Sequence, residues 1–239
     1  MALVKGQVQQ INVGAAAELD NKEFALTKVG QLFTADWRYK LAAAGLAYSA
    51  HIGTLTTGAD VGLIVGGGNG TTVDSDQPEM ILGADNGFII PMSLRVMCDM
   101  DADADGEYGE IIFFADRTQA PPTTATGTPG TVTPNNLLDG AGAFSGRCFG
   151  GVTTDLTDPV MSEFIDGEYV NVAEFVSNGT ATNLTNGVGQ RLKLVYEPLM
   201  PKLLAGPCSL VVCFGGTAAV NGMIAIEFAH VPAGWFPTS

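Results

Sequence analysis

Three carboxylates alternate along a short acidic stretch, Asp101-Ala102-Asp103-Ala104-Asp105-Gly106. Alternate carboxylates before a turning glycine form the first half of the calcium-binding loop of an EF-hand. The second half is missing, because the twelfth position of the loop is Ile112, where calcium needs a bidentate carboxylate. The flanking residues also have strand patterns, whereas an EF-hand has helices. We therefore expect Asp101, Asp103 and Asp105 to bind calcium weakly at most, and otherwise to form a solvated acidic hairpin tip.

Residue types that could carry out catalysis are sparse. His51 and His230 are the only histidines in the chain, and no Gly-x-Ser-x-Gly nucleophile elbow occurs. His230 is in phase with Ile226 and Phe228, which predicts a core or interface position. The glycine-rich residues 66–70 lack the Lys-Ser/Thr of a phosphate loop and predict a turn. We expect no enzymatic activity; a glycosidase-like carboxylate pair is the enzymatic alternative, because acidic residues are numerous.

The four cysteines, Cys98, Cys148, Cys208 and Cys213, include no Cys-x-x-Cys pair. With two histidines in the chain, this spacing does not favour a zinc site. The pattern predicts four buried thiols in a reducing compartment.

Charge and composition narrow the classes of partner. The chain has 11 basic and 25 acidic residues, a net charge of −14, and no run of Lys or Arg. Because nucleic-acid binding depends on cationic groups, we expect no direct contact with DNA or RNA. No apolar stretch approaches the roughly 20 residues that span a bilayer, and the first residues lack a signal-peptide pattern, so we expect synthesis in the cytosol. Charged residues make up only 15% of the chain, which is typical of a surface that contacts other protein.

Helix signals are confined to residues 18–50. Thr34 is a suitable N-cap, Trp37 and Leu41 would share one face, and Gly45 would end a short helix. Beyond this region the patterns are those of strands.

Strand patterns dominate the rest of the chain. Residues 93–100 alternate between apolar and polar side chains, and residues 110–115 form a continuous apolar run that predicts a strand covered on both faces. We interpret the acidic stretch between these two as a hairpin turn. Further strands are predicted at residues 54–65, 144–154, 167–177, 190–196, 209–214 and 223–230. About eight to ten strands indicate an all-β, two-sheet sandwich of the jelly-roll kind.

Two segments stand apart from this regular pattern. Residues 118–136 contain four prolines among many threonines, which predicts a long loop that cannot join a sheet ladder. The C-terminal residues 231–237 include Trp235 and Phe236. We expect Pro121, Pro122, Trp235 and Phe236 to contact neighbouring subunits, although the two rings could also pack on their own domain. The predicted organisation is an N-terminal arm with a short helix at 1–50 and one β-sandwich domain at 51–239, with a loop insertion at 118–136.

Two groups of residues carry a resemblance to known proteins. The first group is Gln77-Pro78-Glu79-Met80-Ile81-Leu82 followed by Gly87-Phe88-Ile89-Ile90-Pro91. It resembles the sheet-forming core of viral jelly-roll structural proteins. The second group is Phe33-Thr34-Ala35-Asp36-Trp37-Arg38 with residues 41–48 and 53–57. It resembles segments of virion proteins predicted for phages and environmental viruses.

The resemblance implies a self-assembling capsid or coat subunit, often a trimer. The partners would be copies of the same chain and other virion proteins, and the protein would reside in the virion after synthesis in the host cytoplasm. The alternative is a receptor- or glycan-binding spike or fibre head with the same fold. The chain lacks the basic N-terminal arm of small RNA-virus coats, which argues against contact with the genome.

Overall fold

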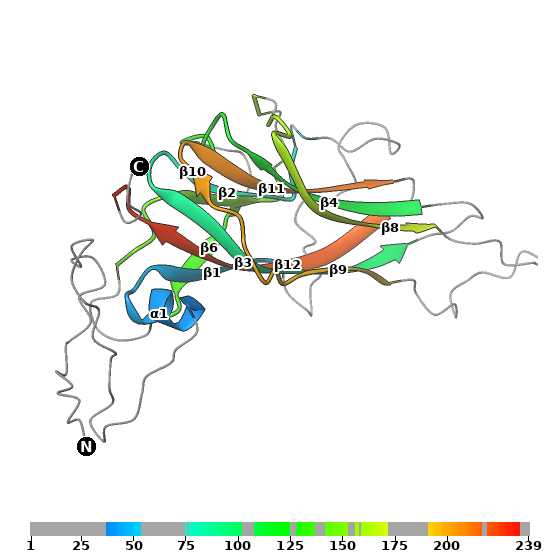
Figure 1. Ribbon diagram of the computed structural model, residues 1–239. Helices are drawn as coiled ribbons and strands as arrows, with labels where there is room; N and C mark the ends of the chain where they lie inside the picture. The colour runs from blue at the N-terminus through cyan, green and yellow to red at the C-terminus, as the bar shows by residue number, and fades with distance from the viewer. Residues whose placement is uncertain are drawn as a thin grey trace, which may run out of the picture.

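The computed structural model describes residues 37–53, 75, 77–101, 108–124, 128–136, 142–152, 156–157, 159–171, 191–216 and 219–234. The described strands form two antiparallel sheets that pack face to face, and a short helix lies outside one of them (Figure 1). The predicted all-β, two-sheet sandwich is therefore confirmed.

The first sheet has the strand order β10-β3-β12-β1-β6, with β9 also paired to β3. Its strands are β1 (Ala47–Ile52), β3 (Phe88–Asp101), β6 (Thr131–Pro134), β9 (Arg191–Tyr196), β10 (Leu204–Ala205) and β12 (Ala219–Val231). The second sheet has the order β5-β7-β2-β11-β4-β8. Its strands are β2 (Met80–Ala84), β4 (Tyr108–Asp116), β5 (Thr128–Pro129), β7 (Arg147–Gly150), β8 (Glu163–Asn171) and β11 (Cys208–Gly216).

The pairing of the long strands is nested. Apart from the short strands β5, β6, β7 and β10, the first strand pairs with the last, β1 with β12. The next pairs inward are β2 with β11, β3 with β9, and β4 with β8. A long antiparallel ribbon rolled into two sheets gives this pattern, which is the eight-strand jelly roll.

Apolar side chains fill the space between the sheets. On β3 the alternation places Leu94, Val96 and Cys98 in this core, as predicted, opposite large rings such as Phe113 of β4 and Phe228 of β12. All nine residues of β11 are buried, because the strand is covered on both faces. The predicted two-sided burial of residues 110–115 is also largely met, since β4 contributes Phe113 to the core and Phe114 to the opposite face.

Different segments cover the outer faces of the two sheets. Helix α1 (Trp37–Ala43) packs on the first sheet, where Leu41 contacts a cluster that includes Ile90 and Val231. Gly45 follows the helix with a φ of 71°, as expected of a C-terminal glycine. On the second sheet, Val152 and Leu156 of the β7–β8 connection cover the outward-facing side chains of β2, β4 and β11.

The predicted hairpin between residues 93–100 and 110–115 is wrong. Strand β3 belongs to the first sheet and β4 to the second, so the two strands that flank the acidic stretch are not paired. Alternation and apolar runs indicate which face of a strand is buried, but they do not identify the neighbouring strand. The acidic stretch therefore does not connect two paired strands.

The prediction that residues 118–136 cannot join a sheet is also wrong in its second half. Strand β5 pairs with β7 and places Pro129 opposite Phe149, while β6 pairs with β1 and places Pro134 opposite Tyr48. Both strands lie at sheet edges, where proline is tolerated because only one side of the strand is hydrogen-bonded. Between them, at Gly130, the chain passes from one sheet to the other.

The whole connection from β4 to β8, residues 117–162, contains β5, β6 and β7. The buried carboxylate of Asp116 holds its two ends together. One carboxylate oxygen accepts hydrogen bonds from the backbone N and the Oγ1 of Thr118, and the other accepts one from the backbone N of Val160. Both ends of the connection are thus tied to the same side chain at the end of β4.

Other strand boundaries differ from the predictions in part. Strand β8 begins at Glu163, before the predicted residue 167, and β1 includes residues 47–50, which the sequence pattern assigns to the N-terminal region with the helix. Strands β2 and β10 were not separately predicted. The predicted strand at 54–65 lies outside the described residues. Residues 172–177 of the strand predicted at 167–177 also lie outside them.

Candidate functional site: assembly surfaces

Two large apolar side chains are almost fully exposed in the connection between β9 and β10. Leu199 is 96% exposed and Met200 is 88% exposed. They lie between Pro198 and Pro201 in a segment that interrupts the pairing of the chain with β3. We refer to Leu199 and Met200 as the apolar knob.

The knob is held in place from both sides. The guanidinium of Arg38 donates a hydrogen bond of 2.8 Å to the carbonyl oxygen of Pro198. The ammonium of Lys202 forms an ion pair with the carboxylate of Glu163 at the start of β8. Since the two prolines also restrict the backbone, the knob is presented on a preorganised loop.

Further exposed apolar side chains lie close in sequence to Glu163 and Lys202, the two residues of this ion pair. Val160, Met161 and Phe164 flank Glu163, and Leu203 follows Lys202. Single exposed apolar residues are ordinary, but contiguous groups of them mark contact sites in many proteins. The β8 and β9 side of the sandwich is therefore a candidate contact surface.

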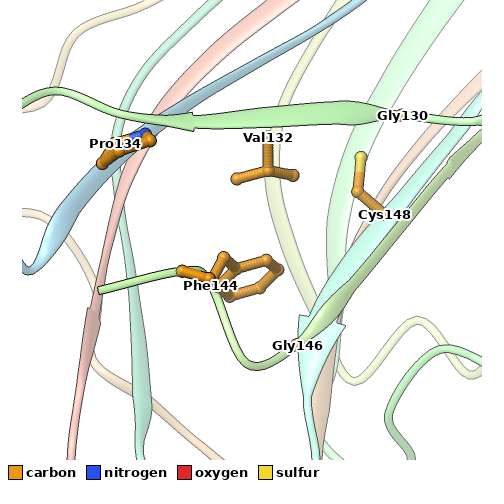
Figure 2. A pocket seen from close by; sticks show the side chains of 7 residues that line it. Gly130, Val132, Pro134, Phe144, Gly146 and Cys148 are labelled. Atoms are coloured by element: carbon orange, nitrogen blue, oxygen red, sulfur yellow. The ribbon is translucent and has the colours of Figure 1, made fainter. Parts of the chain in front are cut away.

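A pocket of about 420 Å³ opens at the opposite side of the sandwich. Figure 2 shows the side chain of Val132 pointing toward the ring of Phe144, with the sulfur of Cys148 beside them. The described residues that line it carry no charge; they are Gly130, Val132, Pro134, Ala143, Phe144, Gly146 and Cys148. The ring of Phe144 is fixed by Tyr48, Phe228 and His230, whose ring centroids are 5.0–5.5 Å away.

Two of the sheet edges, those formed by β8 and β6, are poorly suited to pairing with another chain. Strand β8 ends its sheet and carries Glu163, Asp166 and Glu168, and its register with β4 shifts at Phe113/Phe114. At the other side, β6 ends its sheet with Pro134. Charges, bulges and proline are the usual means by which edge strands avoid sheet extension. At these two edges, contact through loops and pockets is therefore favoured over contact through strand pairing.

The predicted calcium ligands are only partly within the described residues. Asp101 is the last residue of β3, whereas Asp103 and Asp105 lie outside the described part of the chain. Within the described residues, no group of three or more His, Cys, Asp or Glu side chains could hold a metal ion. Calcium binding by the three carboxylates stays a prediction.

The predicted contact residues occupy different environments. Pro121 is buried in its own chain, where its carbonyl oxygen accepts a hydrogen bond of 2.6 Å from Nε of Arg147. Pro122 is partly buried, and Trp235 and Phe236 lie outside the described residues. A contact role for these residues stays a prediction.

His230 has structural partners, and the four cysteines are buried. His230 is partly buried, donates from Nε2 to the carbonyl oxygen of Asn86 at 2.9 Å and contacts Phe144, whereas His51 is exposed on β1. All four cysteines are buried and free, as predicted. Burial raises the pKa of the Cys148 thiol to about 12.

No protein-family model matches this sequence, and no curated protein matches it. The functional argument therefore rests on the fold and on these surfaces. Within the described residues, no helix is long and apolar enough to cross a membrane.

Sequence reasoning did not identify the knob or the pocket. The signal for the knob was present, since Pro198-Leu199-Met200-Pro201 places two large apolar residues between prolines directly after a strand. The pocket had no such signal, because it forms only when β6 and β7 close one side of the sandwich.

Proposed function

We propose that this protein is a structural subunit of a virus coat, without catalytic activity, that assembles with copies of itself. The nested pairing of eight strands is an architecture that viral capsid proteins share with lectins and cupins. The resemblance of residues 77–82 and 87–91 to the core of viral jelly-roll proteins supports the first of these classes.

The observation that carries the proposal is the exposure of Leu199 and Met200. Both side chains extend from a loop that Arg38 contacts at Pro198 and that the Lys202–Glu163 ion pair contacts on the other side. Burial of such a side chain is worth about 1.5–3 kcal/mol, and little ordering entropy is lost because the loop is already fixed. A surface of this kind favours a protein partner.

The negative net charge of the chain fits a coat subunit that does not bind the genome. A net charge of −14 without a basic run does not favour contact with nucleic acid. The proposed partners are therefore other copies of the chain and other virion proteins, and the proposed location is the virion.

The size of the native protein in solution tests the proposal. We expect light scattering and analytical ultracentrifugation to give a trimer or a larger shell, with interfaces above roughly 2,000 Å². Negative-stain electron microscopy would then distinguish closed shells from small oligomers. A protein that stays monomeric at high concentration would contradict the coat role.

A glycan-binding spike or fibre head is the second candidate, and one observation favours it. The ring of Tyr169 is more than half exposed at β8 and lies 5.5 Å from the ring of Tyr108 on β4. Exposed aromatic faces are suited to sugar rings. Glycan-array binding that is lost on Tyr169→Ala would favour this role, and the matched variant Phe164→Ala should then retain binding.

A further inference from the structure

We propose that the apolar knob of one copy, Leu199 and Met200, inserts into the pocket between β6 and β7 of a second copy. This inference rests on the proposed self-assembly and names its contact. The pocket side chains involved are Val132, Phe144 and Cys148, with Ala143 at the exposed rim.

The positions of the knob and the pocket determine the kind of contact. The knob follows β9, which lies at one end of the first sheet, and β6 lies at the other end of that sheet. In the second sheet, β8 is likewise at the end opposite β5 and β7. Two different surfaces therefore meet, which is a heterologous contact, and repetition of that contact gives a ring or an open chain.

Charge and chemistry match across this contact. Each copy has a net charge of −14, so two copies repel each other unless their contact surfaces are close to neutral. The knob has no charge, and the charged residues beside it are paired, Lys202 with Glu163 and Glu197 with Arg95. The described lining of the pocket is also uncharged.

The volume of the pocket and the character of the sheet edges favour the same contact between knob and pocket. A volume of about 420 Å³ is within the range of pockets that accept small apolar groups. The edges at β8 and β6 are blunted by the carboxylates of β8 and by Pro134 of β6, so strand addition is disfavoured at these two edges. The knob and the pocket remain as complementary, uncharged surfaces on one chain.

Two matched methionine variants test the contribution of the knob. Met200→Ser removes the apolar tip, and Met97→Ser makes the same change at a partly exposed position on β3. We expect Met200→Ser to weaken association by at least about tenfold, because the side chain would be fully buried in the contact. Met97→Ser should leave association unchanged. Equal effects of both variants would overturn the proposal.

Cysteine cross-linking tests which surfaces meet. The four natural cysteines are buried, so Ala143→Cys and Met200→Cys each introduce one accessible thiol. We expect a disulfide-linked dimer when the two variants are mixed and oxidised, and little when either is oxidised alone. Rapid cross-linking of Met200→Cys by itself would show that knob meets knob and would overturn the proposal.

The outcomes separate this inference from the proposed function. If the wild-type protein assembles but Met200→Ser assembles equally well and the mixture does not cross-link, the knob-and-pocket contact is wrong and the coat role stands. If the wild-type protein is monomeric throughout, both fail.

Discussion

Gly130 lies so close to Cys148 that a Cβ atom at position 130 would be 2.5 Å from the Cys148 Sγ and 3.1 Å from Cδ1 of Ile52. The backbone N of Gly130 also donates a hydrogen bond of 2.9 Å to the carbonyl oxygen of Cys148. Here the chain leaves β5 in one sheet and enters β6 in the other. The absence of a side chain lets this crossing pack tightly on the edge of the core.

Gly130→Ala is therefore expected to destabilise the protein by about 1–3 kcal/mol, because an added methyl group must displace buried atoms. For a chain of this size, each kcal/mol lowers the melting temperature by about 2–4 °C. Thermal unfolding with Gly142→Ala as control measures the effect, since a Cβ at Gly142 meets no heavy atom within 4 Å. Cys148→Ala should restore part of the loss, and equal melting temperatures for both glycine variants would contradict this account.

Asp116→Ala is expected to loosen both ends of the β4–β8 connection. The substitution removes the acceptor of three hydrogen bonds, two from Thr118 and one from Val160, in a buried site. A loss of at least about 2 kcal/mol should follow, because buried donors are left unsatisfied. Hydrogen exchange should become faster at residues 117–122 and 159–162.

Asp166→Ala is the matched control for the carboxylate at position 116. The Asp166 carboxylate accepts a hydrogen bond from its neighbour Gly167 and is only partly buried. It should leave exchange at residues 117–122 unchanged. Unaltered exchange in Asp116→Ala would show that the connection is held by its other contacts.

Burial of Cys148 is expected to make stability depend on alkaline pH. Burial raises the pKa of this thiol from its ordinary value of 9.0 to about 12, so the folded state binds a proton that the unfolded state releases. The resulting stabilisation is present in full below about pH 9 and is lost as the pH rises toward about 12. Urea unfolding between pH 7 and 11 should show a smaller alkaline loss in Cys148→Ala.

Val132→Ala is a suitable control for this pH dependence, since Val132 lines the same pocket and does not titrate. It should lower stability by the same amount at every pH. A pH dependence in Cys148→Ala equal to that of the wild-type protein would assign the alkaline loss to other groups, such as Cys208, whose pKa burial raises to about 11.

Periodicity predicted the burial of individual strands well. The alternation of Leu94, Val96 and Cys98 places them in the core as expected, because side chains on a strand alternate between faces. The same rule cannot identify partners. Residues 93–100 and 110–115 look like the arms of a hairpin, yet each pairs with a strand more than 80 positions away, as with Leu94 and Ile226 or Phe114 and Val211.

The high proline content of residues 118–136 wrongly predicted a loop where the chain forms edge strands. Pro129 and Pro134 argued for a loop, but an edge strand needs hydrogen bonds on only one side. The exposure of individual apolar side chains also could not be predicted from the sequence. Leu199 and Leu204 are similar residues five positions apart, and only the packing of β10 on β3 buries one of them.

The acidic stretch gives the last prediction, weak calcium binding. Asp101, Asp103 and Asp105 concentrate negative charge, but Ile112 replaces the bidentate carboxylate that strong sites use. Strand β4 begins at Tyr108 in the other sheet, and Ile112 is within it, so it cannot be part of a loop around the ion. We expect a dissociation constant no tighter than roughly 10⁻⁴–10⁻³ M. Titration calorimetry of the wild-type protein, Asp103→Ala and the exposed control Glu168→Gln measures it, and micromolar binding lost only in Asp103→Ala would contradict the expectation.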